Sequence, residues 1–129
     1  MVRSIHVADV PHHVNPVPHA AEHGGFVVSS AIMGMDAATR KFPDTKEAQL
    51  ALAFENLRRV IKACGVTPQD VIRLTLYFAD KDDRPLVNPH WLEMWPDENA
   101  RPARHALLAS ELPPGCVLQL EFMAVAANG

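Results

Sequence analysis

Two charged residues near the C-terminus, Arg104 and Glu121, have the types and the setting to carry out chemistry. Arg104 comes near the start of one apolar segment, and Glu121 lies in the middle of a second one, residues 117–125. If that second segment is a strand, its side chains alternate between two faces, and Glu121 points away from the face formed by Leu118, Leu120 and Phe122. A carboxylate among apolar strand residues is costly unless it is paired or used. If Arg104 and Glu121 face one pocket, they could hold a small carboxylate and handle a proton beside it.

The segment between these residues, Glu111-Leu112-Pro113-Pro114-Gly115, has the composition of a turn. We therefore expect the two flanking segments to be strands that pair as a hairpin or near-hairpin. Such pairing would bring the strand that carries Arg104 next to the strand that carries Glu121.

Each of these residues also has a purely structural interpretation. Arg104 could be a solvated arginine at a strand end, and Glu121 could form a bridge with Arg73 across the sheet. Burying such an ion pair is not by itself stabilising, which favours a functional role for Glu121. His105 carries an imidazole, a common general base. Adjacent strand residues point to opposite faces, however, so if Arg104 enters a cleft, His105 leaves it.

The middle of the chain predicts the elements that position these residues. Asp44-Thr45-Lys46-Glu47 resembles a capping box, with Asp44 or Thr45 as the cap. An apolar stripe from Leu50 to Cys64 predicts a helix that ends at Gly65. Residues 71–79 read as a strand, with Arg73, Thr75 and Tyr77 on one face. We expect a second helix over about residues 84–94, a strand over residues 26–30 and an edge strand over residues 4–7.

This order of elements predicts an α+β fold, a mixed β-sheet with two helices packed on one face. We expect residues 1–129 to form one domain. On the face away from the helices, polar residues alternate with Val117, Met123 and Val125. A half-apolar face of this kind is typical of a subunit interface, so we expect a homo-oligomer.

Composition limits the partners. The chain has a net charge of −3 and a pI near 6.1, so it lacks the basic stripe that collects nucleic-acid phosphates. No segment has transmembrane length, and the first residues lack a signal-peptide core. Two distant cysteines, Cys64 and Cys116, suit buried thiols in a reducing cytoplasm.

Four histidines lie near the N-terminus, at positions 12, 13, 19 and 23. They show no helical i,i+4 spacing, and no cysteine or carboxylate pattern completes a tetrahedral set. We therefore expect no metal site. Ser30 has no His/Asp relay in the sequence and is interpreted as a hydrogen-bond donor, not a nucleophile.

Short motifs along nearly the whole chain resemble those of the RidA/YjgF family of reactive intermediate deaminases. The matching motifs are Asn15-Pro16, Val27-Val28-Ser29-Ser30, Ala63-Cys64-Gly65, Val71-Ile72-Arg73-Leu74-Thr75, Val87-Asn88, Arg101-Pro102-Ala103-Arg104, Glu111-Leu112-Pro113 and Glu121-Phe122-Met123-Ala124-Val125. The final pair of motifs is fairly specific, whereas the helix pattern alone is weak.

The resemblance implies a chorismate-mutase-like fold, a homotrimer with small-ligand clefts between subunits, and no metal or organic cofactor. It implies hydrolysis of reactive enamines or 2-imino acids to 2-oxo acids and ammonia. Arg104 matches the family arginine that clamps the substrate carboxylate, and Glu121 matches the glutamate associated with the attacking water. Ser30 and Asn88 match positions that line the cleft.

The chain departs from the family pattern at three places. Val17 replaces a tyrosine, Ala31-Ile32 replaces Gly-Gln, and His105 replaces a serine or threonine. These changes make the cleft lined by Val17 and Ala31 more apolar. Two functions therefore stay open: a cofactor-free imine deaminase, or a non-catalytic protein that binds small carboxylates or regulates a partner.

Overall fold

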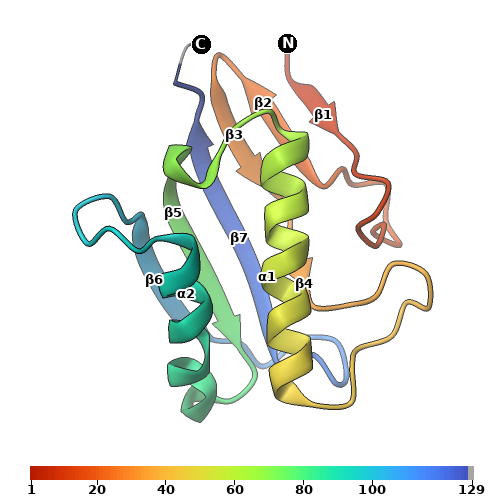
Figure 1. Cartoon of the computed structure of the whole chain (residues 1–129). Helices are drawn as coiled ribbons and strands as arrows, with labels where there is room; N and C mark the ends of the chain where they lie inside the picture. Colours follow the sequence, from red (N-terminus) through yellow and green to blue (C-terminus); the bar gives the residue numbers. More distant parts are fainter. Residues whose placement is uncertain (128–129) are drawn as a thin grey trace.

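The computed structural model describes residues 1–127 and forms one mixed sheet with its helices on one face (Figure 1). Neighbouring strands follow the order β1-β2-β3-β7-β5-β6, and β4 also pairs with β7. The strands are β1 (Arg3–Ile5), β2 (Ala20–His23), β3 (Phe26–Ser29), β4 (Ile32–Met33), β5 (Val71–Phe78), β6 (Ala103–Leu108) and β7 (Leu118–Val125). This arrangement confirms the predicted α+β fold class.

The long helix α1 (Lys46–Ala63) begins and ends as its sequence predicts. The Thr45 hydroxyl accepts a hydrogen bond from the backbone N–H of Ala48 at 3.1 Å, which caps the first turn. Gly65 follows the helix with a φ of 75°, a left-handed conformation that glycine adopts without strain. These two caps determine where the helix begins and ends. Between them, one apolar stripe of the helix packs against the sheet.

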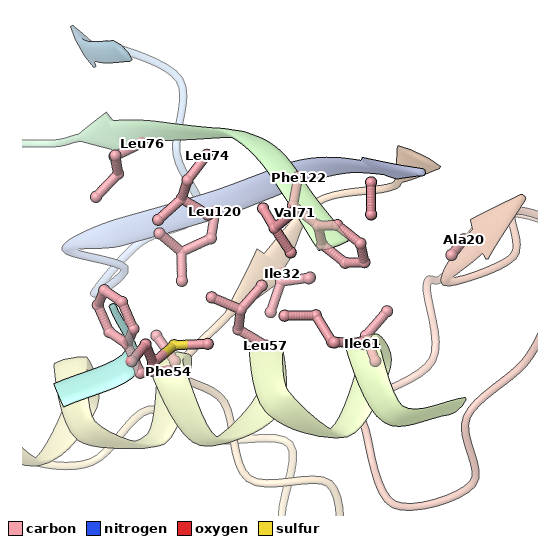
Figure 2. Close-up of a cluster of buried hydrophobic side chains, with 14 of the residues drawn as sticks. Ala20, Ile32, Phe54, Leu57, Ile61, Val71, Leu74, Leu76, Leu120 and Phe122 are labelled. Atoms are coloured by element: carbon pink, nitrogen blue, oxygen red, sulfur yellow. The ribbon is translucent and has the colours of Figure 1, made fainter. Parts of the chain in front are cut away.

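The core lies between α1 and the central strands. In Figure 2, Phe54, Leu57 and Ile61 of the helix face Leu120 and Phe122 of β7, and all five side chains are buried. Leu74 and Leu76 of β5 extend the same apolar layer. Because this layer uses every second residue of β5 and β7, the residues between them project from the other face of the sheet.

The predicted hairpin between β6 and β7 is wrong. β5 lies between them, antiparallel to β7 and parallel to β6. A parallel connection needs a crossover, and here the 3-10 helix η2 (Lys81–Val87) and the short helix α2 (Asn88–Met94) supply it. The Pro/Gly turn therefore still reverses the chain between β6 and β7, but β5 lies between these two strands in the sheet. The predicted single helix over residues 84–94 is correspondingly split into η2 and α2.

A bulge changes the face of Ile72, which strict alternation opposite Arg73, Thr75 and Tyr77 would place in the core. The β5–β7 register shifts between Val71 and Arg73, so Val71 lies in the core and Ile72 is exposed. From Arg73 onward the predicted alternation is confirmed. The short strands β2 and β4 were not predicted, and the N-terminal edge strand spans Arg3–Ile5 instead of residues 4–7.

We expect the buried thiol of Cys64 to make stability depend on alkaline pH. Burial raises the pKa of this thiol from 9.0 to about 11, so the folded state retains the proton that the unfolded chain releases. The contribution of this group is fully present below pH 9 and is lost as the pH rises toward 11. Chemical denaturation at a series of pH values should show a decline, on the order of 1 kcal/mol, that Cys64→Ala removes. An equal decline in both proteins would contradict this assignment.

Candidate functional site

Arg104 is held at the edge of the sheet by two residues of α2. Its Nη1 donates a hydrogen bond to Asn88 Oδ1 at 2.9 Å, and its guanidinium carbon lies 5.2 Å from the ring centroid of Trp91. Stacking on Trp91 and the bond to Asn88 restrict a flexible side chain to one direction. Partial burial lowers the pKa of Arg104, but a guanidinium remains charged in proteins. The group is a positioned cation suited to a carboxylate.

Arg104 projects from the helix face of the sheet. Its partner in the parallel ladder is Leu74, a fully buried core residue. Paired residues share a face, so Arg104 lies on the same side as α1 and α2 (Figure 1). Because β6 is the last strand of the sheet, this cation lies where a further molecule can approach.

Glu121 projects from the opposite face. Its antiparallel partner is Thr75, and the Tyr77 hydroxyl donates a hydrogen bond to Glu121 Oε1 at 2.9 Å. Glu121, Thr75 and Arg73 line a hollow of about 220 Å³ on this outer face. Within residues 1–127 no ion pair joins Arg73 to Glu121, so the structural bridge considered above does not form.

Arg104 and Glu121 therefore do not face a common pocket within one chain. The expectation that they do was based on the hairpin, which would have made their strands neighbours. The observed register instead places one on the helix face and the other on the outer face. A cleft that contains both side chains requires two copies of the chain.

His105 leaves the side of the sheet that carries Arg104, as predicted. Its ladder partner is Thr75, which is also the partner of Glu121 on the other side. Thus His105 and Glu121 share the outer face, separated by one strand, or roughly 10 Å between their backbones. The imidazole is part of the Glu121 surroundings and is remote from the guanidinium.

Ser30 and Ala31 lie beside Glu121, where β3 ends and β4 begins. The Ile32–Leu120 pair, continued by one residue, brings Ala31 opposite Glu121. Ser30 Oγ donates its proton to the Pro18 carbonyl at 2.8 Å, so this hydroxyl connects two backbone segments. Val17 precedes Pro18 and is exposed. Of the predicted cleft residues, Ala31 is near Glu121, Asn88 contacts Arg104, and Ser30 has a structural bond.

Two residues that contact the site were not assigned to it from the sequence. Trp91 was not singled out as a site residue from the sequence, and its ring lies under the Arg104 guanidinium. Tyr77 was placed on the outer face without its hydrogen bond to Glu121. The i,i+3 spacing of Asn88 and Trp91 on one helix was an available signal, since residues so spaced are neighbours.

In residues 1–127, no group of three or more His, Cys, Asp or Glu side chains is arranged to hold a metal ion. No helix in this part of the chain is both long and apolar enough to cross a bilayer.

Comparison with known sequences identifies the family. The sequence model of the Endoribonuclease L-PSP family, which is the RidA/YjgF family indicated by the motifs, matches residues 8–127. The chain belongs to this family.

The RidA/YjgF relatives span the whole chain at low identity. A RutC family protein of Haemophilus influenzae is 28% identical and aligns with 97% of this chain and 98% of its own. The 2-iminobutanoate/2-iminopropanoate deaminase of Salmonella typhimurium is 25% identical over 97% of this chain and 98% of its own. RidA from the Antarctic bacterium Psychrobacter sp. is 25% identical, with a TM-score of 0.86 over 95% of this chain and 98% of that one.

The contact between Tyr77 and Glu121 can be tested directly because Tyr77 is the only tyrosine in the sequence. The hydrogen bond to Glu121 raises the pKa of the phenol, since it stabilises the protonated form. Ultraviolet titration should therefore show a phenol pKa above its ordinary value of 10.0, and Glu121→Ala should lower it. Glu98→Ala, on an exposed loop, is the control and should leave the titration unchanged. Identical curves for wild type and Glu121→Ala would show that the contact does not form in solution.

Proposed function

We propose that the protein hydrolyses reactive 2-imino acids and the related enamines to 2-oxo acids and ammonia, without a cofactor. The observation that carries this proposal is the pair of positioned charges: a guanidinium held by Asn88 and Trp91, and a carboxylate held by Tyr77. This hydrolysis uses two groups: a cation that binds the carboxylate of the substrate, and a protein carboxylate that orients and deprotonates the attacking water. The Salmonella typhimurium relative is named for such an activity.

In this reaction Arg104 binds the substrate carboxylate through two parallel hydrogen bonds. Its planar fork determines both the position and the rotation of the ligand, which fixes the imine carbon relative to the water. Asn88 and Trp91 hold the guanidinium in place before the substrate arrives. Less conformational entropy is then lost on binding than with a free side chain.

Glu121 orients the water that attacks the imine carbon and accepts a proton from it. As the C–O bond forms, Glu121 passes the proton taken from water to the imine nitrogen, which gives a carbinolamine. The hydroxyl proton then moves to the same nitrogen, the C–N bond breaks as the C=O bond forms, and ammonia leaves. Tyr77 occupies Oε1 of Glu121 at 2.9 Å and leaves the second oxygen for water. In residues 1–127, no other side chain hydrogen bonds to this carboxylate.

Two copies of the chain form the cleft in this proposal. One supplies Arg104 from its helix face at the sheet edge, and the other supplies Glu121 from its outer face. Exposed Phe26 and Val28 on β3 extend the half-apolar outer face, which supports its burial against a second copy. We propose the homotrimer of the family as the assembly, since three such contacts close a ring.

A carboxylate-binding or regulatory protein without catalysis is the second candidate. The observation that favours it is the hydrogen bond from the Ser30 hydroxyl to the Pro18 carbonyl. Because this hydroxyl already donates its proton, one fewer hydrogen-bond donor is available to a ligand beside Glu121. Small 2-oxo acids would be the ligands in that case. Nucleic acid is a poor candidate despite the family description, because the chain has a net charge of −3.

The cytoplasm is the proposed location of the reaction. Cys64 and Cys116 are both free and buried, which suits a reducing compartment.

The test is ammonia release from freshly generated 2-imino acids, made in place by an amino-acid oxidase. We expect the wild type to accelerate release, Arg104→Ala to lose at least about a hundredfold in kcat/KM, and Arg104→Lys to restore only part, because lysine cannot bind both oxygens. Glu121→Ala should lower kcat more than it weakens binding.

Full activity of the Arg104→Ala protein would contradict the assignment. No acceleration by the wild type, together with pyruvate binding that Arg104→Ala abolishes, would establish the binding protein instead.

A further inference from the structure

A second hollow, larger than the one that Glu121 lines, lies along β7 from Glu121 and has no role in the proposed reaction. Its volume is about 410 Å³, and Ala31, Met33 and Gln119 line it. Met33 and Gln119 are partners across the β4–β7 ladder, and Gln119 precedes Glu121 by two residues on the same face. Two residues along a strand span roughly 7 Å. A small ligand bound at the Glu121 carboxylate could therefore extend into the hollow.

The walls of this hollow are mainly apolar. Ile32, Met35, Val10 and Pro113 contribute side chains from β4 and from three loops far apart in the sequence. A volume of about 410 Å³ lies within the range of small-molecule sites. Such a surface favours a hydrocarbon group over water.

Hydrogen bonds hold the loop that closes the hollow. His19 is buried, accepts the backbone N–H of Val7 on Nδ1 at 2.9 Å and has Nε2 2.9 Å from the Pro11 carbonyl. Arg40 Nη1 donates to the His12 carbonyl at 3.0 Å. These contacts give the segment that carries Val10 a defined position before any ligand binds.

The histidines at the rim are compatible with an apolar ligand. His13 lines the hollow, and burial together with nearby His19 lowers the pKa of His13. His13 is then mainly uncharged at neutral pH. His12 and Arg40 also line the hollow, and both are exposed, so their polar groups remain hydrated.

We propose that this hollow binds the side chain of the substrate, and that the protein prefers 2-imino acids with large apolar side chains over those with a methyl or ethyl group. This inference rests on the proposed function. A methyl group would leave most of the hollow to water, whereas a branched or thioether chain would displace that water and contact the methionines. Each methylene buried should raise kcat/KM about fourfold.

The experiment compares imines generated from alanine, leucine, methionine and phenylalanine, with kcat/KM as the readout. In the wild type, the leucine- and methionine-derived imines should be favoured over the alanine-derived one by at least about tenfold. Met33→Trp fills the hollow and should lower that ratio at least about tenfold. Ala51→Trp adds the same side chain on the exposed face of α1 and should keep the wild-type ratio.

Met35→Ala provides a second variant in case the indole prevents folding, which circular dichroism will show. It enlarges the hollow and should shift preference toward the phenylalanine-derived imine. A wild type that prefers the alanine-derived imine, or a ratio that neither Met33→Trp nor Met35→Ala changes, would overturn the proposal.

Absence of imine hydrolysis can be distinguished from absence of side-chain binding in the hollow. If no imine is hydrolysed, calorimetric binding of 4-methyl-2-oxopentanoate and of pyruvate gives the same comparison without catalysis. Tighter binding of the larger acid by at least about tenfold, lost in Met33→Trp, would support the pocket. Equal affinities for the two acids would overturn it.

Discussion

The alternation of side chains along β5 and β7 is the constraint on which the rest of the structure depends. Leu74, Leu120 and Phe122 complete the core against α1, so the residues between them can only project outward. Glu121 is one of these residues. A shift of one residue in this register would expose the core and bury the carboxylate, so the packing that stabilises the fold also determines the position of Glu121.

The same constraint separates the two charged groups. Arg104 pairs with Leu74 and is therefore on the helix face, where Asn88 and Trp91 hold it. Glu121 pairs with Thr75 and is on the outer face, where Tyr77 holds it. Each side chain has its own support, yet neither completes a site in one chain. Assembly is then a chemical requirement of the proposed reaction as well as a means of covering the half-apolar face.

Features that depend on local sequence could be predicted, and features that depend on register could not. The start of α1 after Asp44 or Thr45, its end at Gly65 and the alternation of β7 follow from neighbouring residues, and all were confirmed, with Thr45 as the cap. The β6–β7 hairpin was wrong because a Pro/Gly turn reverses the chain whether or not another strand lies between the two segments.

The Ile72 bulge and the bond between Tyr77 and Glu121 depend on how β5 aligns with β7, which no local pattern specifies. The family motifs indicated Arg104 and Glu121 without indicating that they lie on opposite faces. Their catalytic and binding roles stay predictions.

Mixed assemblies test the two-copy cleft most directly. Arg104→Ala and Glu121→Ala subunits, carrying different affinity tags, would be co-expressed and purified through both tags, and imine hydrolysis would be compared with each variant alone. Purification through both tags removes assemblies of a single variant. Each mixed trimer then has one cleft in three with both side chains intact, so two inactive variants should together regain up to about a third of wild-type activity. Mixed assemblies as inactive as the separate variants would contradict a cleft shared between subunits.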